Sequence, residues 1–216
     1  MAATSQTSGQ IALRDPDTRL MIAVRDDEPG AFEELVEKYQ HRLVAVLHHL
    51  VGQAQEAEDL AQEVFLRVYR ARKKYRARAK FSTWLFTIAN NLAANALRNR
   101  HRKRVVSLPA RDSGPLGARP AERLAQDTGN RPSHQMRTLE LAAVVRQALE
   151  GLNERQRTAV ILNKFEDMNY AEIAEVMGLS TKAVKSLLNR ARTNLRDALK
   201  DYVLMDVEPM PPLPAE

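Results

Sequence analysis

The stretch YAEIAEVMGLSTKAVKSLLNRA, residues 170–191, has the pattern of two helices joined by a tight turn. Small Ala174 stands where two such helices approach closely, and Gly178 stands where the turn needs a left-handed backbone. Ser180 or Thr181 is expected to cap the second helix. Apolar residues at the remaining spacings predict the contact between the helices: Ile173, Val176, Leu179, Val184 and Leu187. The pattern predicts a helix-turn-helix rather than an ordinary helical hairpin, the alternative that it leaves open.

Helical spacing of apolar residues continues through most of the chain, and strand-like alternation is absent. Gly52 is expected to end one helix, and Ser82 or Thr83 to cap another. The helices are expected at 17–25, 31–51, 56–72, 81–104, 136–152, 154–165, 170–177 and 181–202. The fold class predicted is therefore all-α.

Proline and glycine interrupt this pattern in the interior and near the C-terminus. We predict two small helical domains joined by a flexible linker. The expected organisation is a disordered N-terminus over 1–14, helical domains over 15–106 and 136–204, a linker over 107–135 and a disordered tail over 205–216.

Charge is distributed very unevenly. From Val64 to Arg111 the chain has no Asp or Glu but fourteen Lys or Arg. A merely solvated helix face normally mixes both signs, because oppositely charged neighbours stabilise it. Together with a net charge of +6, this stretch favours a nucleic-acid partner, since phosphate neutralisation dominates such binding.

The segment FSTWLFTIANNLAANALRNRHRKR, from Phe81 to Arg104, combines aromatic, amide and basic residues on one expected helix. Trp84 can also be explained as a core residue. The asparagines are harder to explain by packing, because Asn is a mediocre helix former whose amide can bind a base edge. Aromatic residues beside cations favour single-strand binding.

Other classes of protein find little support. There is no apolar run long enough for a membrane span and no secretory signal, and the absence of cysteine fits a reducing cytoplasm. No phosphate loop, zinc motif or catalytic triad occurs, so we expect no enzyme, cofactor or metal. His48 and His49 are adjacent and diverge on a helix. An ordinary DNA-binding regulator would explain the helix-turn-helix but not the acid-free stretch.

Two motifs, one in each expected domain, carry a family resemblance. The first consists of DLAQEVFLRVYRA and the following KFSTWLFTIANNLAANALRNR. The second is LNERQRTAVILNKFEDMNYAEIAEVMGLSTKAVKSLLNRARTNLR. Together they resemble the extracytoplasmic-function (ECF) sigma factors, the small members of the sigma-70 family. The resemblance covers about 15–106 as region 2 and 136–204 as region 4. It implies a chain that binds core RNA polymerase, recognises the −10 and −35 promoter elements and initiates transcription.

The resemblance also assigns residues. The helix that docks on the polymerase β′ subunit corresponds to Asp59, Gln62, Glu63, Phe65 and Tyr69. Contacts to the −10 element fall on Lys80, Trp84, Asn91, Arg98, Arg100 and Arg102, with the loop 71–82 receiving a flipped base. Contacts to the −35 element fall on Lys182, Lys185, Ser186, Asn189, Arg190 and Arg192. The expected partners are core polymerase through β′ and β, duplex and melted promoter DNA, and a separate anti-sigma factor.

Overall fold

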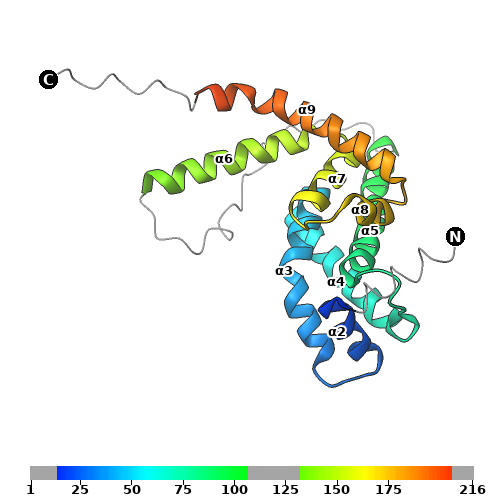
Figure 1. The fold of residues 1–216 in the computed structure, drawn as a ribbon. Coiled ribbons are helices and arrows are strands. Elements are labelled where there is room, and N and C mark those ends of the chain that lie inside the picture. The colour runs from blue at the N-terminus through cyan, green and yellow to red at the C-terminus, as the bar shows by residue number, and fades with distance from the viewer. Residues whose placement is uncertain (1–13, 107–131, 206–216) are drawn as a thin grey trace, which may run out of the picture. The chain divides into compact units, whose positions relative to one another are not determined.

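The structure is a computed structural model that describes residues 14–106 and 132–205 (Figure 1). These residues form helices and turns, and no strand occurs among them. The all-α class predicted from the sequence is confirmed. The expected N-terminal and C-terminal disorder and most of the expected linker lie outside the described residues.

The helices follow the expected pattern closely. They are α2 (Pro16–Arg25), α3 (Ala31–Val51), α4 (Ala54–Ala71), the short 3-10 helix η1 (Arg72–Lys74), α5 (Phe81–Val106), α6 (Pro132–Glu150), α7 (Glu154–Lys164), α8 (Tyr170–Met177) and α9 (Thr181–Met205). The bounds of α3 and α8 coincide with those predicted, and the others differ by a few residues. Such differences are ordinary, because helix ends are the least determined part of a periodic pattern.

The described residues divide into two compact units. The first combines residues 14–106 with 158–188, and the second combines 132–157 with 189–205. The first unit therefore holds the N-terminal helices together with α8 and the beginning of α9. Domain boundaries at 15–106 and 136–204 stay a prediction from the sequence.

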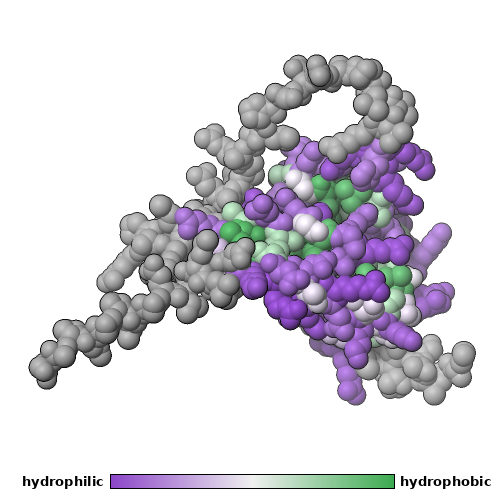
Figure 2. All heavy atoms as spheres, turned by 90° about the horizontal axis from the view of Figure 1, so that it is seen from above, coloured by the Kyte–Doolittle hydropathy of each residue, from purple (hydrophilic) through white to green (hydrophobic). Residues whose placement is uncertain are grey.

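The core of the first unit is centred on α3. Leu35, Leu43 and Leu47 of this helix are fully buried, and so are Val64 and Leu85 of α4 and α5, the helices against which α3 packs. A fully buried aliphatic side chain contributes about 1.5–3 kcal/mol relative to an exposed one. Hydrophilic side chains cover most of the face seen in Figure 2, with smaller apolar patches between them.

Asp15, the N-cap of α2, and Thr18 of α2 together cap the start of α5. The Phe81 N–H donates to Asp15 Oδ2 at 3.3 Å and to Thr18 Oγ1 at 3.1 Å. Asp15 also accepts from the Thr18 N–H at 3.2 Å, which caps α2 itself. The expectation that Ser82 or Thr83 caps this helix was wrong, because α5 begins before both residues and its first amide is bound by side chains from another helix.

The helix-turn-helix has the local chemistry that its sequence predicts. Gly178 adopts the left-handed conformation, with φ of 63°, and ends α8. Ser180 Oγ accepts from the Ala183 N–H at 3.2 Å, which caps α9. At the other end of α8, Asn169 and Glu172 form a capping box that sequence analysis had not identified. The capping box thus sets where α8 begins, and the Gly178 turn with the Ser180 cap sets where α8 ends and α9 begins.

Candidate nucleic-acid interface

The α5 helix presents a cationic surface to solvent. Asn91, Arg98 and Arg102 are exposed on it, and no acidic residue occurs anywhere along its length. Arg98 is bonded to Asn95 on the same helix, a local contact that leaves its guanidinium accessible. These residues can therefore meet phosphates without displacing a partner from another part of the chain.

Arg100 differs from the other arginines predicted for this surface. Its guanidinium donates to the Val51 carbonyl oxygen at 3.0 Å and forms an ion pair with Glu56. Its side chain is 30% exposed. Arg100 therefore ties α5 to the end of α3 and the start of α4. Whether it also contacts DNA stays a prediction.

Trp84 stands beside a depression formed by the loop before α5. The Tyr75 and Trp84 ring centroids lie 5.0 Å apart, and Trp84 is half-buried. Burial raises the pKa of the Tyr75 phenol, so this residue stays neutral at physiological pH. The depression is lined mainly by cations and aromatic rings: Ala71, Lys74, Tyr75, Arg76, Arg78, Ala79 and Trp84, with Glu175 of α8. Its chemistry suits a planar base attached to a phosphate.

Lys80, predicted to contact the −10 element, lies at the end of this loop and pairs with α8. Its ammonium is 2.8 Å from a Glu172 carboxylate oxygen, and that hydrogen bond raises the pKa of Lys80. Nearby, the Asn90 amide donates to the Val176 carbonyl oxygen at 3.4 Å. Within the first unit, the start of α5 and its loop are thus joined to the first helix of the helix-turn-helix.

The α9 helix carries a second set of polar and basic residues. Their spacing places Lys182, Lys185, Ser186, Asn189 and Arg190 along one side of an α-helix. All are exposed except Ser186, which is half-buried. Arg192 donates to Asn189 Oδ1 at 3.3 Å. We call this set, with Arg192, the α9 surface; its side chains are of the types that bind phosphates and base edges in a major groove.

A third set lies on α4. Asp59, Gln62 and Leu66 are exposed there, and Glu63 pairs with Arg67 at 2.7 Å. Leu66, with 48% of its surface exposed, was missed by sequence analysis because one leucine in a helical pattern is normally read as core. Asp59, Gln62, Glu63 and Leu66, together with Tyr69, are called the α4 surface below.

Phe65, which the resemblance placed with these residues, has a different environment. Only 9% of its surface is exposed, whereas Gln62 and Leu66 of the same helix are exposed. A buried side chain offers little area to a partner. Phe65 therefore belongs to the core of the first unit, and a contact with polymerase stays a prediction.

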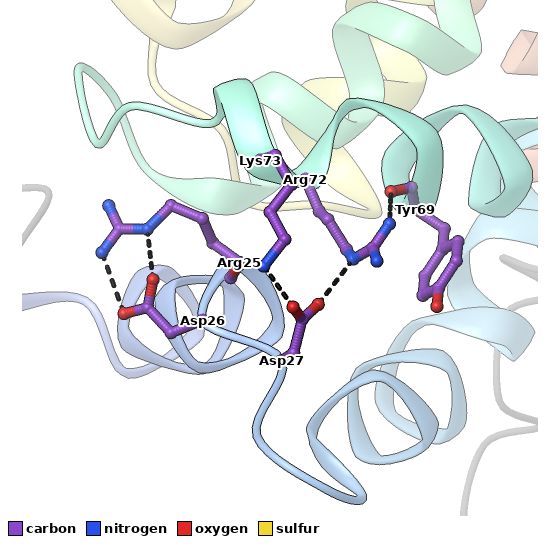
Figure 3. Close-up of polar contacts among 6 residues, drawn as sticks. All are labelled: Arg25, Asp26, Asp27, Tyr69, Arg72 and Lys73. Carbon is purple, nitrogen blue, oxygen red and sulfur yellow. Dashed lines mark hydrogen bonds and ion pairs between the residues drawn. The ribbon is translucent and has the colours of Figure 1, made fainter.

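Charged residues join the end of α4 to the turn between α2 and α3. Figure 3 shows Asp27 of that turn between the side chains of Arg72 and Lys73, while Asp26 is bonded to Arg25. Two cations of the acid-free stretch therefore share one carboxylate within the protein. The count of fourteen cations in that stretch consequently overstates the number that are free to bind phosphate.

Two negative findings hold for residues 14–106 and 132–205. No cluster of three or more His, Asp or Glu side chains suitable for a metal ion was found among them. No helix in those ranges has the length and apolarity that crossing a bilayer requires.

Comparison with known proteins accounts for both helical regions. The family model described as Sigma-70 region 2 matches residues 35–103, and the one described as Sigma-70, region 4 matches residues 142–195. An RNA polymerase sigma-H factor of Pseudomonas aeruginosa is 36% identical over 191 residues, covering 87% of this chain and 95% of that protein. The ECF RNA polymerase sigma factor SigW of Bacillus subtilis is 30% identical over 178 residues, covering 82% and 94%.

A solved structure shares the fold. The sigma factor RpoE of Bartonella quintana, in complex with the anti-sigma factor NepR, aligns with a TM-score of 0.59 at 24% identity. The alignment covers 79% of this chain and 98% of that one. With both family regions present in order, and with relatives matched over nearly their whole length, the chain belongs to the sigma-70 family of RNA polymerase sigma factors, within its ECF group.

Proposed function

We propose that this protein directs core RNA polymerase to a set of promoters by three surfaces of its own. The α4 surface binds polymerase, α5 and its preceding loop engage the −10 element, and the α9 surface engages the −35 element. The observation that carries this proposal is the acid-free α5: its exposed Asn91, Arg98 and Arg102 follow Trp84 along one side of the helix, and Trp84 itself lines the aromatic and cationic depression.

The two DNA surfaces suit different forms of DNA. A major groove admits an α-helix, and the polar residues of α9 project from a single helix, as duplex reading requires. The depression before α5 offers aromatic rings and cations, which bind an unstacked base and its phosphate. The protein therefore reads the −35 element as duplex and the −10 element as a melted strand.

The α4 surface combines charge with an exposed apolar centre. Leu66 and Tyr69 are 48% and 43% exposed, and polar residues flank Leu66 on both sides along the helix: Asp59, Gln62 and Glu63 before it, Arg67 and Arg70 after it. An apolar centre with a polar rim is typical of protein–protein interfaces. This combination supports α4 as the site for core polymerase, with its β′ subunit as the partner.

Reconstituted transcription tests the proposal. Purified core polymerase, this protein and a promoter identified by genome-wide mapping of its binding sites should give a defined transcript, and core polymerase alone should not. An ordinary DNA-binding regulator would leave core polymerase inactive until another sigma factor was added, and that result would overturn the proposal. The protein is expected to act in the cytoplasm and to catalyse no reaction itself.

A separate protein inhibitor is the remaining proposed partner. The solved sigma factor RpoE of Bartonella quintana is bound to an anti-sigma factor, which supports a similar arrangement for this chain. We expect such an inhibitor to cover the α4 surface and so to compete with core polymerase. Copurification from the native cell should yield a protein that polymerase displaces; repeated failure to recover one would count against this partner.

A further inference from the structure

The Tyr69 ring is held on two sides although nearly half of its surface is exposed. The Arg72 guanidinium carbon lies 3.9 Å from the centroid of the Tyr69 ring. The Phe32 ring of α3 lies on another side, with its centroid 4.9 Å away. An aromatic ring between a guanidinium and a second ring has few accessible orientations. Tyr69 therefore presents its exposed edge in one defined direction.

Arg72 is itself fixed by hydrogen bonds. Its Nη1 donates to the Tyr69 carbonyl oxygen at 3.0 Å, and its Nε donates to Asp27 Oδ1 at 3.0 Å. Its side chain is only 21% exposed, much less than that of most surface arginines. One backbone oxygen and one carboxylate thus hold the Arg72 guanidinium in place, and the Tyr69 ring lies against that guanidinium (Figure 3).

Asp27 is a suitable anchor because its own position is well defined. It lies in the α2–α3 turn with φ of 60°, in the left-handed region that Asp and Asn tolerate best among non-glycine residues. Its other oxygen receives the Lys73 ammonium, which also donates to the Arg25 carbonyl oxygen at 2.7 Å. Hydrogen bonds from Lys73 and Arg72 lower the pKa of Asp27, so the carboxylate stays charged at physiological pH.

We propose that Asp27 is a positioning residue for polymerase binding: through Arg72 it orients the Tyr69 ring on the α4 surface before polymerase arrives. The inference rests on the proposed function, because it requires that surface to meet polymerase. A ring that is already oriented loses less conformational freedom when it is buried in an interface. Asp27 itself need not touch the partner.

The variant Asp27→Asn tests this role with little backbone strain, because asparagine also tolerates the left-handed conformation. We expect its affinity for core polymerase to fall about twofold to fivefold, as for the loss of a partly exposed ion pair. Asp26→Asn is the matched control: Asp26 is the neighbouring carboxylate, and its bonds at 2.8 and 3.0 Å go to Arg25 rather than to Arg72. Unchanged affinity in Asp27→Asn would overturn the inference.

A double-mutant cycle with Tyr69→Ala separates positioning from general stability. If Asp27 acts through the ring, Asp27→Asn should have no further effect on polymerase affinity once Tyr69 is alanine. An equal loss in both backgrounds would show that Asp27 acts through the stability of the domain, and the positioning role would be wrong. Arg72→Lys should weaken binding like Asp27→Asn, because it keeps the charge but removes the planar group that stacks.

The same cycle distinguishes failure of the inference from failure of the proposed function. If Tyr69→Ala itself leaves polymerase affinity unchanged, Tyr69 does not belong to the docking surface and the inference falls with that assignment. If Tyr69→Ala weakens binding and Asp27→Asn does not, the docking surface stands and the positioning role alone is rejected.

Discussion

Glu172 binds two partners through its two carboxylate oxygens. One oxygen accepts from the Lys80 ammonium at 2.8 Å, and the other accepts from the Asn169 N–H at 2.8 Å. The same carboxylate therefore completes the capping box of α8 and neutralises a lysine predicted to meet the −10 element. While this pair is formed, the negative charge of Glu172 opposes the approach of a phosphate to Lys80.

The variant Glu172→Gln should release Lys80 without uncapping α8, because glutamine also serves in a capping box. We expect the free protein to bind a single-stranded −10 oligonucleotide about twofold to fivefold more tightly, since the pair is partly exposed and of modest strength. Fluorescence anisotropy measures this affinity. In a Lys80→Gln background the same change should have no effect, and a gain there would show that Glu172 acts on other cations.

Asn91 provides a test of promoter opening. Its side chain is exposed on α5, and a good base contact contributes about 1–3 kcal/mol. Asn91→Ala should abolish opening while leaving duplex binding largely intact, as measured by permanganate footprinting and by gel shift. Asn99→Ala, another exposed asparagine of α5, is the control. A complex of Asn91→Ala that opens the promoter like the parent would remove Asn91 from the mechanism.

Arg190 provides a test of −35 reading. A bidentate contact from arginine to guanine contributes about 1–3 kcal/mol of discrimination. Arg190→Ala should reduce promoter use and relax preference at one −35 position, as measured by selection from randomised sites. Arg196→Ala is a charge-matched control, because Arg196 lies on a different side of α9 beside Asp197. Selection of the same motif by Arg190→Ala and the parent would refute the assignment.

Alanine substitutions of Arg98 and Arg100 should distinguish a residue that binds DNA from one that stabilises the fold. Arg100→Ala removes bonds to Val51 and Glu56 and should lower the free energy of unfolding by about 1–2 kcal/mol, allowing for partial exposure. Arg98→Ala should change that free energy little but weaken DNA binding, since the hydrogen bond of Arg98 to Asn95 is local to α5. Denaturant unfolding and promoter titration measure the two effects. Equal destabilisation by both changes would contradict the distinction.

The helices could be predicted because their signals are local. The apolar spacing of α3 lies within its own 21 residues, and the left-handed turn after it requires only Gly52, whose φ is 78°. The helix-turn-helix was predictable for the same reason. Its capping residue Ser180 and turn residue Gly178 lie within the motif itself.

The contacts that decide which cations are paired with a carboxylate could not be predicted in this way. Arg100 and Glu56 are 44 residues apart, and Arg72 and Asp27 are 45 residues apart. Nothing in local spacing relates such residues, because their meeting depends on how complete helices pack. Fourteen cations in an acid-free stretch therefore appear equivalent in the sequence. In the structure, some bind carboxylates from other helices and others face solvent.

The bonds from Asp15 and Thr18 to Phe81 bear on how regions are exchanged between sigma factors. The region 2 family model begins at residue 35, whereas the acceptors for the first amide of α5 lie twenty and seventeen residues earlier. A chimera joined at the family boundary would transfer the DNA-facing helix without the side chains that cap it. A transplant that begins at Asp15 would carry the helix and its cap together.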